Sequence, residues 1–388
     1  MTRAFIVDAV RSPVGKRGGG LAHVHPADLS GAVLQALQQR TGVDPAEIDD
    51  VVWGCVNQVG DQAAQIGRYA VLAAGWPESV PGTTVNRACG SGQQAIDFAA
   101  GMVLAGQYDL VVAGGVESMS RVPLGSASHG GRPYGSRARE RYARPLAAEG
   151  FPEGDFNQGI GAELIAQQWG LTRRALDEYA SQSHARMAEA VDASAFEGQL
   201  TEVLEAPGVT TDEGLRRGTD LEGLGALQPS FRPNGLIHAG NASQIADGAA
   251  ALLVASEEKV ASLGLRPIAR YVGGAVAGSD PIMMLTGPIP ATQKLLARTG
   301  VSMADIGTYE VNEAFASVPL AWLAALEADP ARLNPQGGAI AMGHPLGASG
   351  AILMTKMVHH MRDQGIRFGL QAICEGGGTA NATLVELV

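Results

Sequence analysis

The chain has 388 residues, a length that allows two or three domain-sized units with an extensive core. Hydrophobic residues make up 46% and charged residues only 17%, a composition that indicates a well-buried globular protein and excludes a disordered one. The net charge of −11 argues against nucleic acid or an anionic membrane as a partner, although a local basic pocket could still bind phosphate.

The three cysteines are widely separated and do not form a disulfide framework, so we expect a reducing, cytoplasmic setting. We expect no signal peptide, because the first run, Ala4–Val7, resembles a strand and not a charged segment followed by an apolar one. No apolar stretch approaches the length of a membrane span, so we expect no membrane partner.

The first 120 residues alternate strand and helix patterns joined by short glycine turns, which predicts a layered α/β fold. The pattern predicts strands over Ala4–Asp8, Asp50–Val56, Thr83–Asn86 and Leu110–Gly114, and helices over Pro26–Gln39, Gln65–Ala74 and Gly92–Ala105. The following segment, Ser120–Gln158, is rich in Gly, Pro, Ser and Arg. We predict a long loop there with a functional or interaction role, because structureless connections of this length are otherwise uncommon.

Helical patterning returns after this loop, over Gly161–Gln168 and Thr172–Ala193, and Thr172 is the expected N-cap of the second helix. Strand and helix patterns alternate again from Ala249–Ala255 to the end of the chain. This second alternating region predicts that the α/β fold continues after the loop.

The two ends of the chain resemble repeats of one unit. A Gly-Ser-Gly turn at residues 90–92 opens one helix, and a Gly-Ala-Ser-Gly turn at residues 347–350 opens another. Each helix is followed by an apolar strand and then by glycines. A duplicated α/β half would bring Cys89 and His344, which lie beside these turns, close together across a pseudo-twofold axis.

Cys89 is the candidate nucleophile. It lies among glycines just before a helix, where free backbone N–H groups and the positive end of the helix should favour thiolate and lower its pKa. The same N–H groups can bind a developing oxyanion. A buried structural cysteine is the alternative for an isolated Cys. The glycine-rich polar segments 343–350 and 374–378 favour the nucleophile, because they supply the partners that it needs.

A thiolate nucleophile needs a base that takes its proton and often a second acid/base group. Among eight histidines, His344 alone lies in a glycine-rich loop between a strand-like run and a helix. Cys374 ends a strand, and the three glycines that follow should leave its sulfur accessible. Asn312 follows an apolar strand and could hold a water or donate an amide hydrogen bond. We therefore predict these three residues as partners of Cys89.

Taken together, these segments resemble the thiolase family over essentially the whole chain. The motifs that carry the resemblance are Asn86–Gly92, Gly114–Ser120, Gly240–Ser243 with Asp247–Ala250, Asn312–Phe315, Gly343–Gly347 and Cys374–Gly378. The resemblance implies a five-layered αβαβα fold made of two duplicated halves with an inserted loop domain. The halves would be residues 1–119, completed by about 248–265, and residues 266–388, and the loop domain would be residues 120–247.

The resemblance also implies an acyltransferase. It would cleave a 3-ketoacyl-CoA with CoA to acyl-CoA and acetyl-CoA, as in fatty acid β-oxidation, or run the reverse Claisen condensation of two acetyl-CoA as an acetyl-CoA acetyltransferase. Coenzyme A would be a substrate, with no permanently bound cofactor and no metal. The family pattern further implies a homotetramer of two tight dimers, with no nucleic acid or membrane as partner.

The resemblance assigns roles to the candidate catalytic residues. Cys89 would be acylated, and Cys374 would exchange a proton at the substrate α-carbon or the departing enolate. His344 would activate Cys89 and, with a water held by Asn312, would bind the thioester oxygen of the second substrate. The backbone N–H groups of Cys89 and Gly376 would form the other oxyanion hole.

The resemblance also assigns four substrate contacts. Arg216 and Ser243 match positions that contact the nucleotide and pantetheine parts of CoA. Met284 and Phe315 match apolar positions that line the acyl end.

The sequence departs from the family's short-chain biosynthetic pattern at one place. Asn157 and Gln158 stand where a His-Met pair narrows the pocket, which favours a longer or bulkier acyl chain. Two other functions stay open at this point. A ketoacyl synthase on the same fold would normally carry His or Asn in place of Cys374. A catalytically silent acyl-CoA- or lipid-binding protein would usually lack the nucleophile or the base.

Overall fold

The computed structural model describes residues 2–128, 130–131, 133–150 and 156–388. Its strands form one ten-stranded sheet in the order β4-β3-β5-β6-β1-β7-β10-β9-β8, with β2 beside β6. The strands are β1 (Ala4–Arg11), β2 (Gly15–Lys16), β3 (Asp50–Gly54), β4 (Thr83–Val85), β5 (Leu110–Ser118), β6 (Ala246–Ser256), β7 (Ala269–Gly278), β8 (Thr308–Val311), β9 (Phe368–Glu375) and β10 (Thr379–Leu387).

The α-helices are α1 (Pro26–Thr41), α2 (Ile66–Ala73), α3 (Ser91–Leu104), α4 (Ser136–Ala148), α5 (Gln158–Gln168), α6 (Arg173–Asp192), α7 (Leu221–Gly225), α8 (Glu257–Ser262), α9 (Pro288–Thr299), α10 (Ser317–Leu326), α11 (Ala339–Met342) and α12 (Leu346–Gln364). Short 3-10 turns occupy Pro45–Glu47, Gly60–Gln62, Ser126–Ser128, Met303–Asp305 and Pro330–Arg332. No helix in the described part of the chain is long and apolar enough to cross a membrane.

The sheet consists of two halves with the same connectivity. In the first half, β3 runs parallel to β5, and β5, β6 and β1 follow as antiparallel neighbours. In the second half, β8 runs parallel to β9, and β9, β10 and β7 follow as antiparallel neighbours. The halves join where β1 meets β7, through the pairs Phe5–Arg270 and Ile6–Ala269. The duplication expected from the sequence is therefore present in the strand order.

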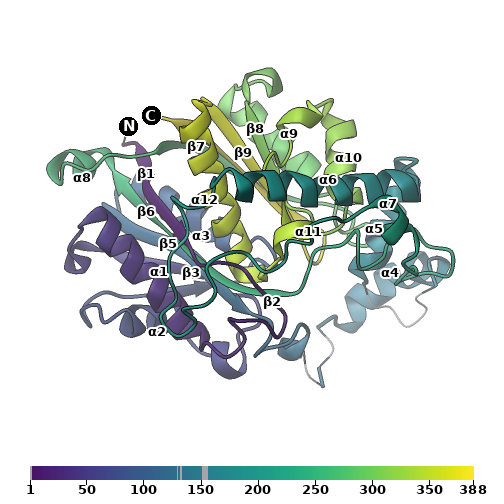
Figure 1. Cartoon of the computed structure of the whole chain (residues 1–388), viewed down its shortest axis with the longest axis horizontal. Coiled ribbons are helices and arrows are strands. Elements are labelled where there is room, and N and C mark those ends of the chain that lie inside the picture. The colour runs from purple at the N-terminus through teal and green to yellow at the C-terminus, as the bar shows by residue number, and fades with distance from the viewer. Residues whose placement is uncertain (1, 129, 132, 151–155) are drawn as a thin grey trace.

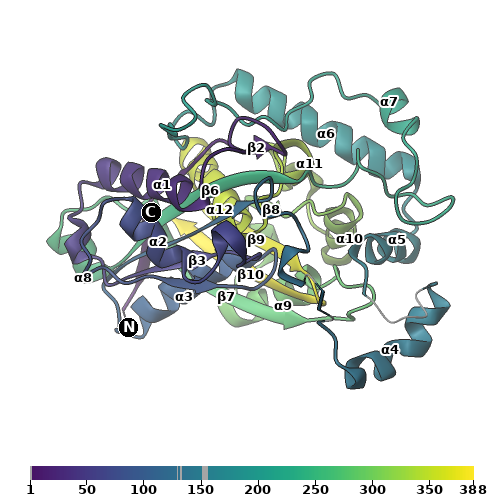
Figure 2. The ribbon, with the colours of Figure 1, turned by 90° about the horizontal axis from the view of Figure 1, so that it is seen from below.

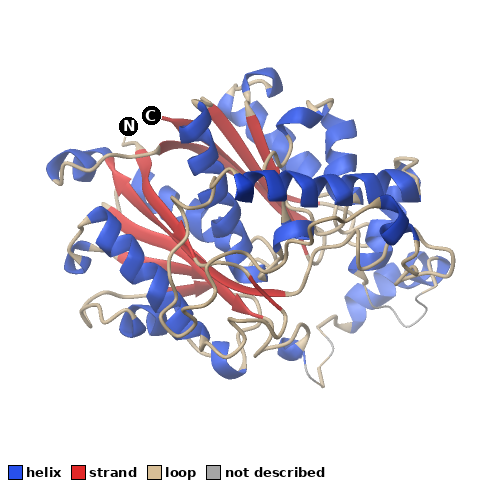
Figure 3. Ribbon diagram, in the orientation of Figure 1, coloured by secondary structure: helices blue, strands red, loops and turns tan. Residues whose placement is uncertain are grey.

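The helices complete five layers around these strands. Helices α3 and α12 pack between the two half-sheets, as Figure 1 and Figure 3 show. Three apolar clusters separate the layers: a central one that includes Ile96 and Met357, one under α1 that includes Leu34, and one under α9 and α10 that includes Trp322. The αβαβα architecture predicted above is confirmed. It places the start of both central helices deep inside the molecule.

The chain between β5 and β6 leaves the sheet for more than a hundred residues and returns at Ala246. Its described part contains α4 to α7 and no strand. Figure 2 shows α6 and α7 above the strands and α4 reaching away from the rest of the chain. The boundary predicted at residue 247 lies inside β6, whose first two residues are Ala246 and Asp247.

Two local predictions were wrong. The segment Ser120–Gln158, predicted as a loop, contains the 13-residue helix α4, and its residues 129, 132 and 151–155 lie outside the described part. Its Gly and Pro content hid a run of Ala, Arg, Glu and Leu, which all have high helix propensity. The strand-like run before His344 is the short helix α11. Its four residues are all buried, and a short apolar run gives the same pattern in either structure.

Candidate active site

Cys89 stands at a tight turn between β4 and α3. Ala88 adopts a left-handed backbone with φ of 44°, which aims the next residue at the start of the helix. Asn86 Oδ1 accepts from the Ala88 N–H at 2.9 Å. Ser91 Oγ donates to the Ala88 carbonyl at 2.6 Å and accepts from the Arg87 N–H at 2.9 Å. These bonds hold the strained turn and fix the position of Cys89.

Glycines let the turn of Cys89 touch the loop of His344. A Cβ atom on Gly92 would lie 2.8 Å from the Gly347 carbonyl oxygen, and one on Gly115 would overlap the same atom. A Cβ on Gly350 would overlap the backbone nitrogen of Gln93. Only glycine therefore allows the first turns of α3 and α12 to approach this closely.

His344 lies in this loop, buried, with both ring nitrogens engaged. Nδ1 lies 2.6 Å from Ser349 Oγ, and Ser349 Oγ donates its proton to the Pro345 carbonyl at 2.8 Å. Since a hydroxyl has one proton, Nδ1 carries the imidazole proton and Nε2 keeps a lone pair. Nε2 lies 3.3 Å from Asn312 Nδ2. Burial lowers the pKa of His344 to about 4, so the ring is a neutral base at pH 7.

The loop of His344 is anchored by a carboxylate that the sequence interpretation assigned no role. Glu117 is buried on β5. One of its oxygens accepts from the N–H groups of Val56 and Gly347, each at 2.9 Å. The other accepts from Asn57 and Gln62. Glu117 therefore ties the first turn of α12 to the segment after β3.

A second buried carboxylate, that of Glu313, anchors the segment that contains Asn312. Its carboxylate accepts from Tyr179 Oη at 2.9 Å, Ser183 Oγ at 2.7 Å, Asn334 Nδ2 at 3.1 Å and the Ile340 N–H at 3.0 Å. These contacts join α6 and α11 to the residue next to Asn312. Both glutamates belong to motifs that carry the family resemblance, and only the structure shows which groups they hold.

Cys374 lies at the end of β9, paired with Ala380 of β10, and is buried with 1% exposed. The three glycines after it do not expose its sulfur in this structure, contrary to the expectation from sequence. Its pKa is raised well above the usual value by burial and by the neighbouring Cys89 and Glu375. Cys89 and Cys374 are thus close enough to influence each other, and Cys374 is a thiol at rest.

The expectation of a lowered Cys89 pKa was also wrong. Burial, followed by the charge of Glu375, raises the pKa of Cys89 to about 12. Hydrogen bonds from the backbone of Gly376 and of Cys89 itself act in the opposite direction and are weaker. Cys89 is therefore a neutral thiol at pH 7, and the backbone N–H groups of Gly376 and of Cys89 itself lie near its sulfur. Such a thiol can transfer an acyl group once a base removes its proton.

A cavity of about 210 Å³ opens on the side of the segment between β5 and β6. Arg216, Gln244 and Ile340 belong to its lining. The Gln244 carbonyl accepts from the His344 N–H at 2.9 Å, so the cavity wall is continuous with the loop of His344. Ser243 is not part of the lining, although its neighbour Gln244 is.

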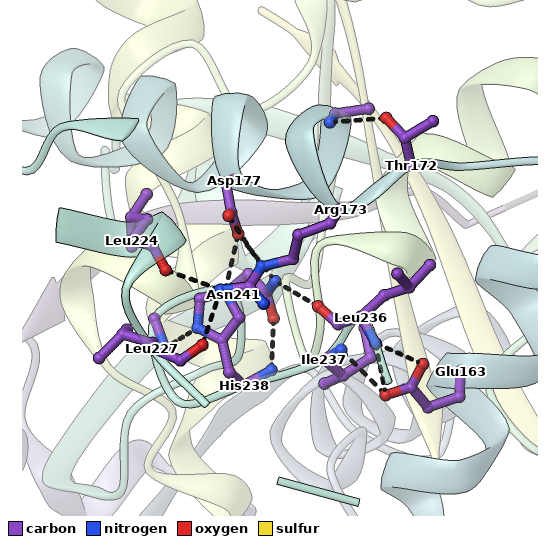
Figure 4. A network of polar contacts seen from close by, with 12 residues as sticks. Glu163, Thr172, Arg173, Asp177, Leu224, Leu227, Leu236, Ile237, His238 and Asn241 are labelled. Carbon is purple, nitrogen blue, oxygen red and sulfur yellow. Dashed lines mark hydrogen bonds and ion pairs between the residues drawn. The ribbon is translucent and has the colours of Figure 1, made fainter. Parts of the chain in front are cut away.

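A buried polar network shapes another wall of this cavity (Figure 4). Asp177 accepts from His238 Nε2 at 2.7 Å and from Arg173 Nε at 2.8 Å. Arg173 also donates to the carbonyls of Leu224 and Leu227, at 2.7 and 3.0 Å, and both leucines line the cavity. Hydrogen bonds therefore hold the cavity wall at Leu224 and Leu227.

Met284 and Phe315 do not reach this cavity. Both are buried in the apolar cluster of the second half. Phe315 packs edge-on against Phe231, with ring centroids 5.9 Å apart. Met284 has a left-handed φ of 54°.

Asn157 and Gln158 have separate positions in the structure. Asn157 is the N-cap of α5 and accepts from the Ile160 N–H at 3.2 Å. Gln158 Nε2 lies 3.2 Å from the point where a Cβ on Gly376 would stand. Gln158 is therefore a neighbour of Gly376, and Asn157 is a structural cap.

The described residues bring Cys89, Cys374 and Gly376 together, and His344 together with Asn312. Leu346, two residues after His344, packs in one apolar cluster with Cys89. All three cysteines are free. Among the described residues, no group of three or more His, Cys, Asp or Glu side chains could hold a metal ion.

Comparison with known proteins matches two family models, the thiolase N-terminal domain over residues 4–258 and the thiolase C-terminal domain over residues 265–387. The chain is 48% identical over 387 residues to the steroid 3-ketoacyl-CoA thiolase FadA6 of Mycobacterium tuberculosis, covering all of this chain and 94% of that protein. It is 42% identical to the 3-oxoadipyl-CoA/3-oxo-5,6-dehydrosuberyl-CoA thiolase of Escherichia coli, with both chains fully covered. The crystal structure of the Bacillus anthracis acetyl-CoA acetyltransferase matches with a TM-score of 0.89 and 36% identity, over 100% of this chain and 99% of that one.

Proposed function

Because the chain belongs to the thiolase family, we propose that Cys89 is the nucleophile of its acyl-transfer reaction. The chain is an acyltransferase of the 3-ketoacyl-CoA thiolase type. The observation that carries the proposal is the place of Cys89 in the turn before α3, where its own N–H and that of Gly376 lie near its sulfur. Two donors there can stabilise the oxyanion that forms when the sulfur attacks a carbonyl carbon.

In the cleavage direction, Cys89 attacks the keto carbon of a 3-ketoacyl-CoA while His344 Nε2 takes the thiol proton. The bond between the α- and β-carbons breaks, and the acetyl-CoA enolate takes a proton from Cys374. The thiol of CoA then gives its proton to the Cys374 thiolate and attacks the acyl group. The departing Cys89 sulfur recovers its proton from His344.

Asn312 supports the step in which the acetyl-CoA enolate forms. Its Oδ1 is buried and has no hydrogen-bond partner among the described residues, so it can accept from a water. Its Nδ2 stands beside His344 Nε2, and both can face the oxygen of the bound thioester. In these roles Asn312 and His344 touch the substrate that becomes the enolate.

We assign the cavity beside Arg216 to coenzyme A. A guanidinium binds phosphate oxygens through paired hydrogen bonds, and Arg216 is the cationic residue in the cavity wall. The wall shared with the loop of His344 gives the pantetheine arm a path towards Cys89. Ser243, next to Gln244, stays a predicted contact of that arm.

The acyl group is proposed to be longer or bulkier than acetoacetyl. Gln158 beside Gly376 supports this, since it replaces the Met of the short-chain pattern. The names of the relatives support it too, because one acts on steroid 3-ketoacyl-CoA and the other on 3-oxoadipyl-CoA. Met284 and Phe315 stay predicted wall residues of the acyl end.

The intact mass of the protein after incubation with acetyl-CoA tests the nucleophile. We expect one acetyl adduct, placed on Cys89 by peptide mapping, and none in Cys89→Ser, which should keep the fold. An adduct on Cys55 or Cys374 would refute the assignment. A ketoacyl synthase is not favoured, because Cys374 stands where such an enzyme would carry His or Asn. A catalytically silent acyl-CoA- or lipid-binding protein is not favoured either, because both Cys89 and His344 are present.

We also keep the homotetramer as a proposal. Strand β4 is an edge of the sheet, and the helices beside it expose Tyr69, Leu72, Phe98 and Leu104, which favours a partner on this face. Native mass spectrometry would test it. The division into two halves and a loop domain, and the cytoplasmic location, likewise stay proposals, the latter supported by the three free cysteines.

A further inference from the structure

A buried carboxyl group lies against the turn that carries Cys89. Glu375 follows Cys374 at the end of β9 and is fully buried, and so is Asn381 on β10. A Cβ on Gly90, the residue after Cys89, would overlap Glu375 Oε1 and would lie 3.0 Å from Asn381 Oδ1 and from its Nδ2. The carboxyl and the amide therefore both lie against Gly90, in the turn that carries Cys89.

The hydrogen bonds of this pair are incomplete. Asn381 Nδ2 donates to the Gly90 carbonyl at 3.1 Å, which fixes the orientation of the amide, because a flipped amide would set two acceptors face to face. Glu375 Oε2 accepts from Thr379 Oγ1 at 2.5 Å. Glu375 Oε1 and Asn381 Oδ1 are buried without a partner among the described residues. Two such oxygens can satisfy each other only if one of them carries a proton.

The charged and titratable groups around Glu375 come from four elements. Arg87, in the turn before α3, approaches Oε2 at 4.0 Å and is partly exposed. Asp97 of α3 accepts from Tyr271 of β7 and adds negative charge nearby. Burial raises the pKa of Glu375 to about 7, against the opposing effects of Thr379 and Arg87. The charge of Glu375 raises the pKa of both Cys89 and Cys374.

We propose that Glu375 is a positioning residue that works as a neutral carboxylic acid. Its Oε1–H donates to Asn381 Oδ1, and Asn381 Nδ2 in turn holds the Gly90 carbonyl and the turn of Cys89. In this form the charge of Glu375 no longer faces the two thiols, and the smaller effect of Glu117 on Cys89 stays the same. The inference rests on the proposed function only in taking Cys89 as the reacting thiol.

When Glu375 loses its proton, two changes follow. The bond to Asn381 is lost, and a carboxylate faces the sulfurs that have to become thiolates. The thiolate form of Cys89 then becomes less favourable as the pH rises through the pKa of Glu375. Each unit by which this raises the Cys89 pKa lowers the thiolate fraction about tenfold.

The rate of alkylation of Cys89 by iodoacetamide, followed by peptide mass across about pH 5.5 to 9.5, measures this effect. We expect the logarithm of the wild-type rate to bend near pH 7 and to fall about tenfold below its extrapolated line. Glu375→Gln, whose amide can donate to Asn381 Oδ1 and cannot ionise, should give a straight line. A wild-type plot without the bend, or a bend that survives in Glu375→Gln, overturns the proposal.

Two further variants test whether Asp97 causes the bend and keep the test possible if Glu375→Gln does not fold. The pKa of Asp97 is also raised by burial, to about 7, and Asp97→Asn must keep the bend. If Glu375→Gln does not fold, Thr379→Val removes the hydroxyl that stabilises the carboxylate and should move the bend to higher pH; an unmoved bend contradicts the proposal. Alkylation needs no substrate, so failure of Cys89 to take up an acetyl group would refute the proposed function and leave this test intact.

Discussion

Replacing Glu117 by Gln tests how the loop of His344 is held to the segment after β3. One carboxylate oxygen accepts the N–H groups of Val56 and Gly347, and the other accepts three hydrogens from Asn57 and Gln62. In Glu117→Gln the new NH₂ group must face at least two of these donors. Two lost hydrogen bonds to a charged acceptor correspond to about 3–6 kcal/mol.

Removing a buried charge offsets part of this loss, so we expect a destabilisation of about 3 kcal/mol. With an unfolding entropy of about 2.1 cal/mol/K per residue, the chain should lose about 4 °C in Tm. Because Gly347 belongs to the first turn of α12, the loop of His344 should also move, and the rate of acetyl transfer to Cys89 should fall at least about tenfold.

Differential scanning calorimetry and rapid-quench acetylation would measure both effects. Glu178→Gln is the control, since its ion pair with Arg174 is exposed and should contribute less than about 1 kcal/mol. A Glu117→Gln protein with the Tm and acetylation rate of the wild type would show that this carboxylate does not hold the loops.

Three other predictions concern the proposed roles. Cys374→Ala should still take up an acetyl group on Cys89 but should not exchange acetyl α-protons with deuterated water, as mass spectrometry of recovered acetyl-CoA would show; normal exchange would refute the acid/base role. Arg216→Ala should raise KM for CoA by about tenfold with little change in kcat, as expected for loss of one charged hydrogen bond; an unchanged KM would remove Arg216 from the CoA site. The kcat/KM for thiolysis should rise several-fold per two added carbons from C4 to medium chains, because each buried methylene contributes up to about 0.8 kcal/mol. Gln158→Met should flatten this dependence on chain length. A kcat/KM that peaks at acetoacetyl-CoA and collapses at C6 would show a narrow pocket.

The strands and helices of the first 120 residues could be predicted from the sequence because their signals are local. Helix α1 begins at Pro26, as predicted. Beyond this region, the predicted N-cap Thr172 also caps α6 by accepting from the Ala175 N–H at 3.2 Å. Helix α4 was missed because the composition of the surrounding segment outweighed a short run of helix-forming residues. The repeated glycine turns predicted a duplicated α/β half, and the strand order shows this duplication.

The support of the site could not be read from the sequence. Glu117 and Gly347 are separated by 230 residues, and Tyr179 and Glu313 by 134. No local pattern indicates which buried carboxylate meets which backbone N–H. Likewise, the sequence predicted that Asn157 and Gln158 together shape the acyl pocket. In the structure Asn157 caps α5, and Gln158 alone lies beside Gly376.

The pKa of Cys89 is raised and not lowered, which shows whether burial or the helix terminus has the larger effect on a thiol at a buried helix start. The helix terminus favours an anion by about 0.3–1 kcal/mol, rising to about 2 kcal/mol in partly buried geometries. Full burial of an ionisable group shifts its pKa by up to about 3–5 units, which corresponds to about 4–7 kcal/mol. Burial therefore outweighs the helix terminus, and Cys89 rests as a thiol while His344 rests as a neutral imidazole. In the proposed mechanism the proton moves only as the substrate carbonyl oxygen becomes negative beside the N–H groups of Cys89 and Gly376. The thiolate then need not accumulate before the acyl group arrives.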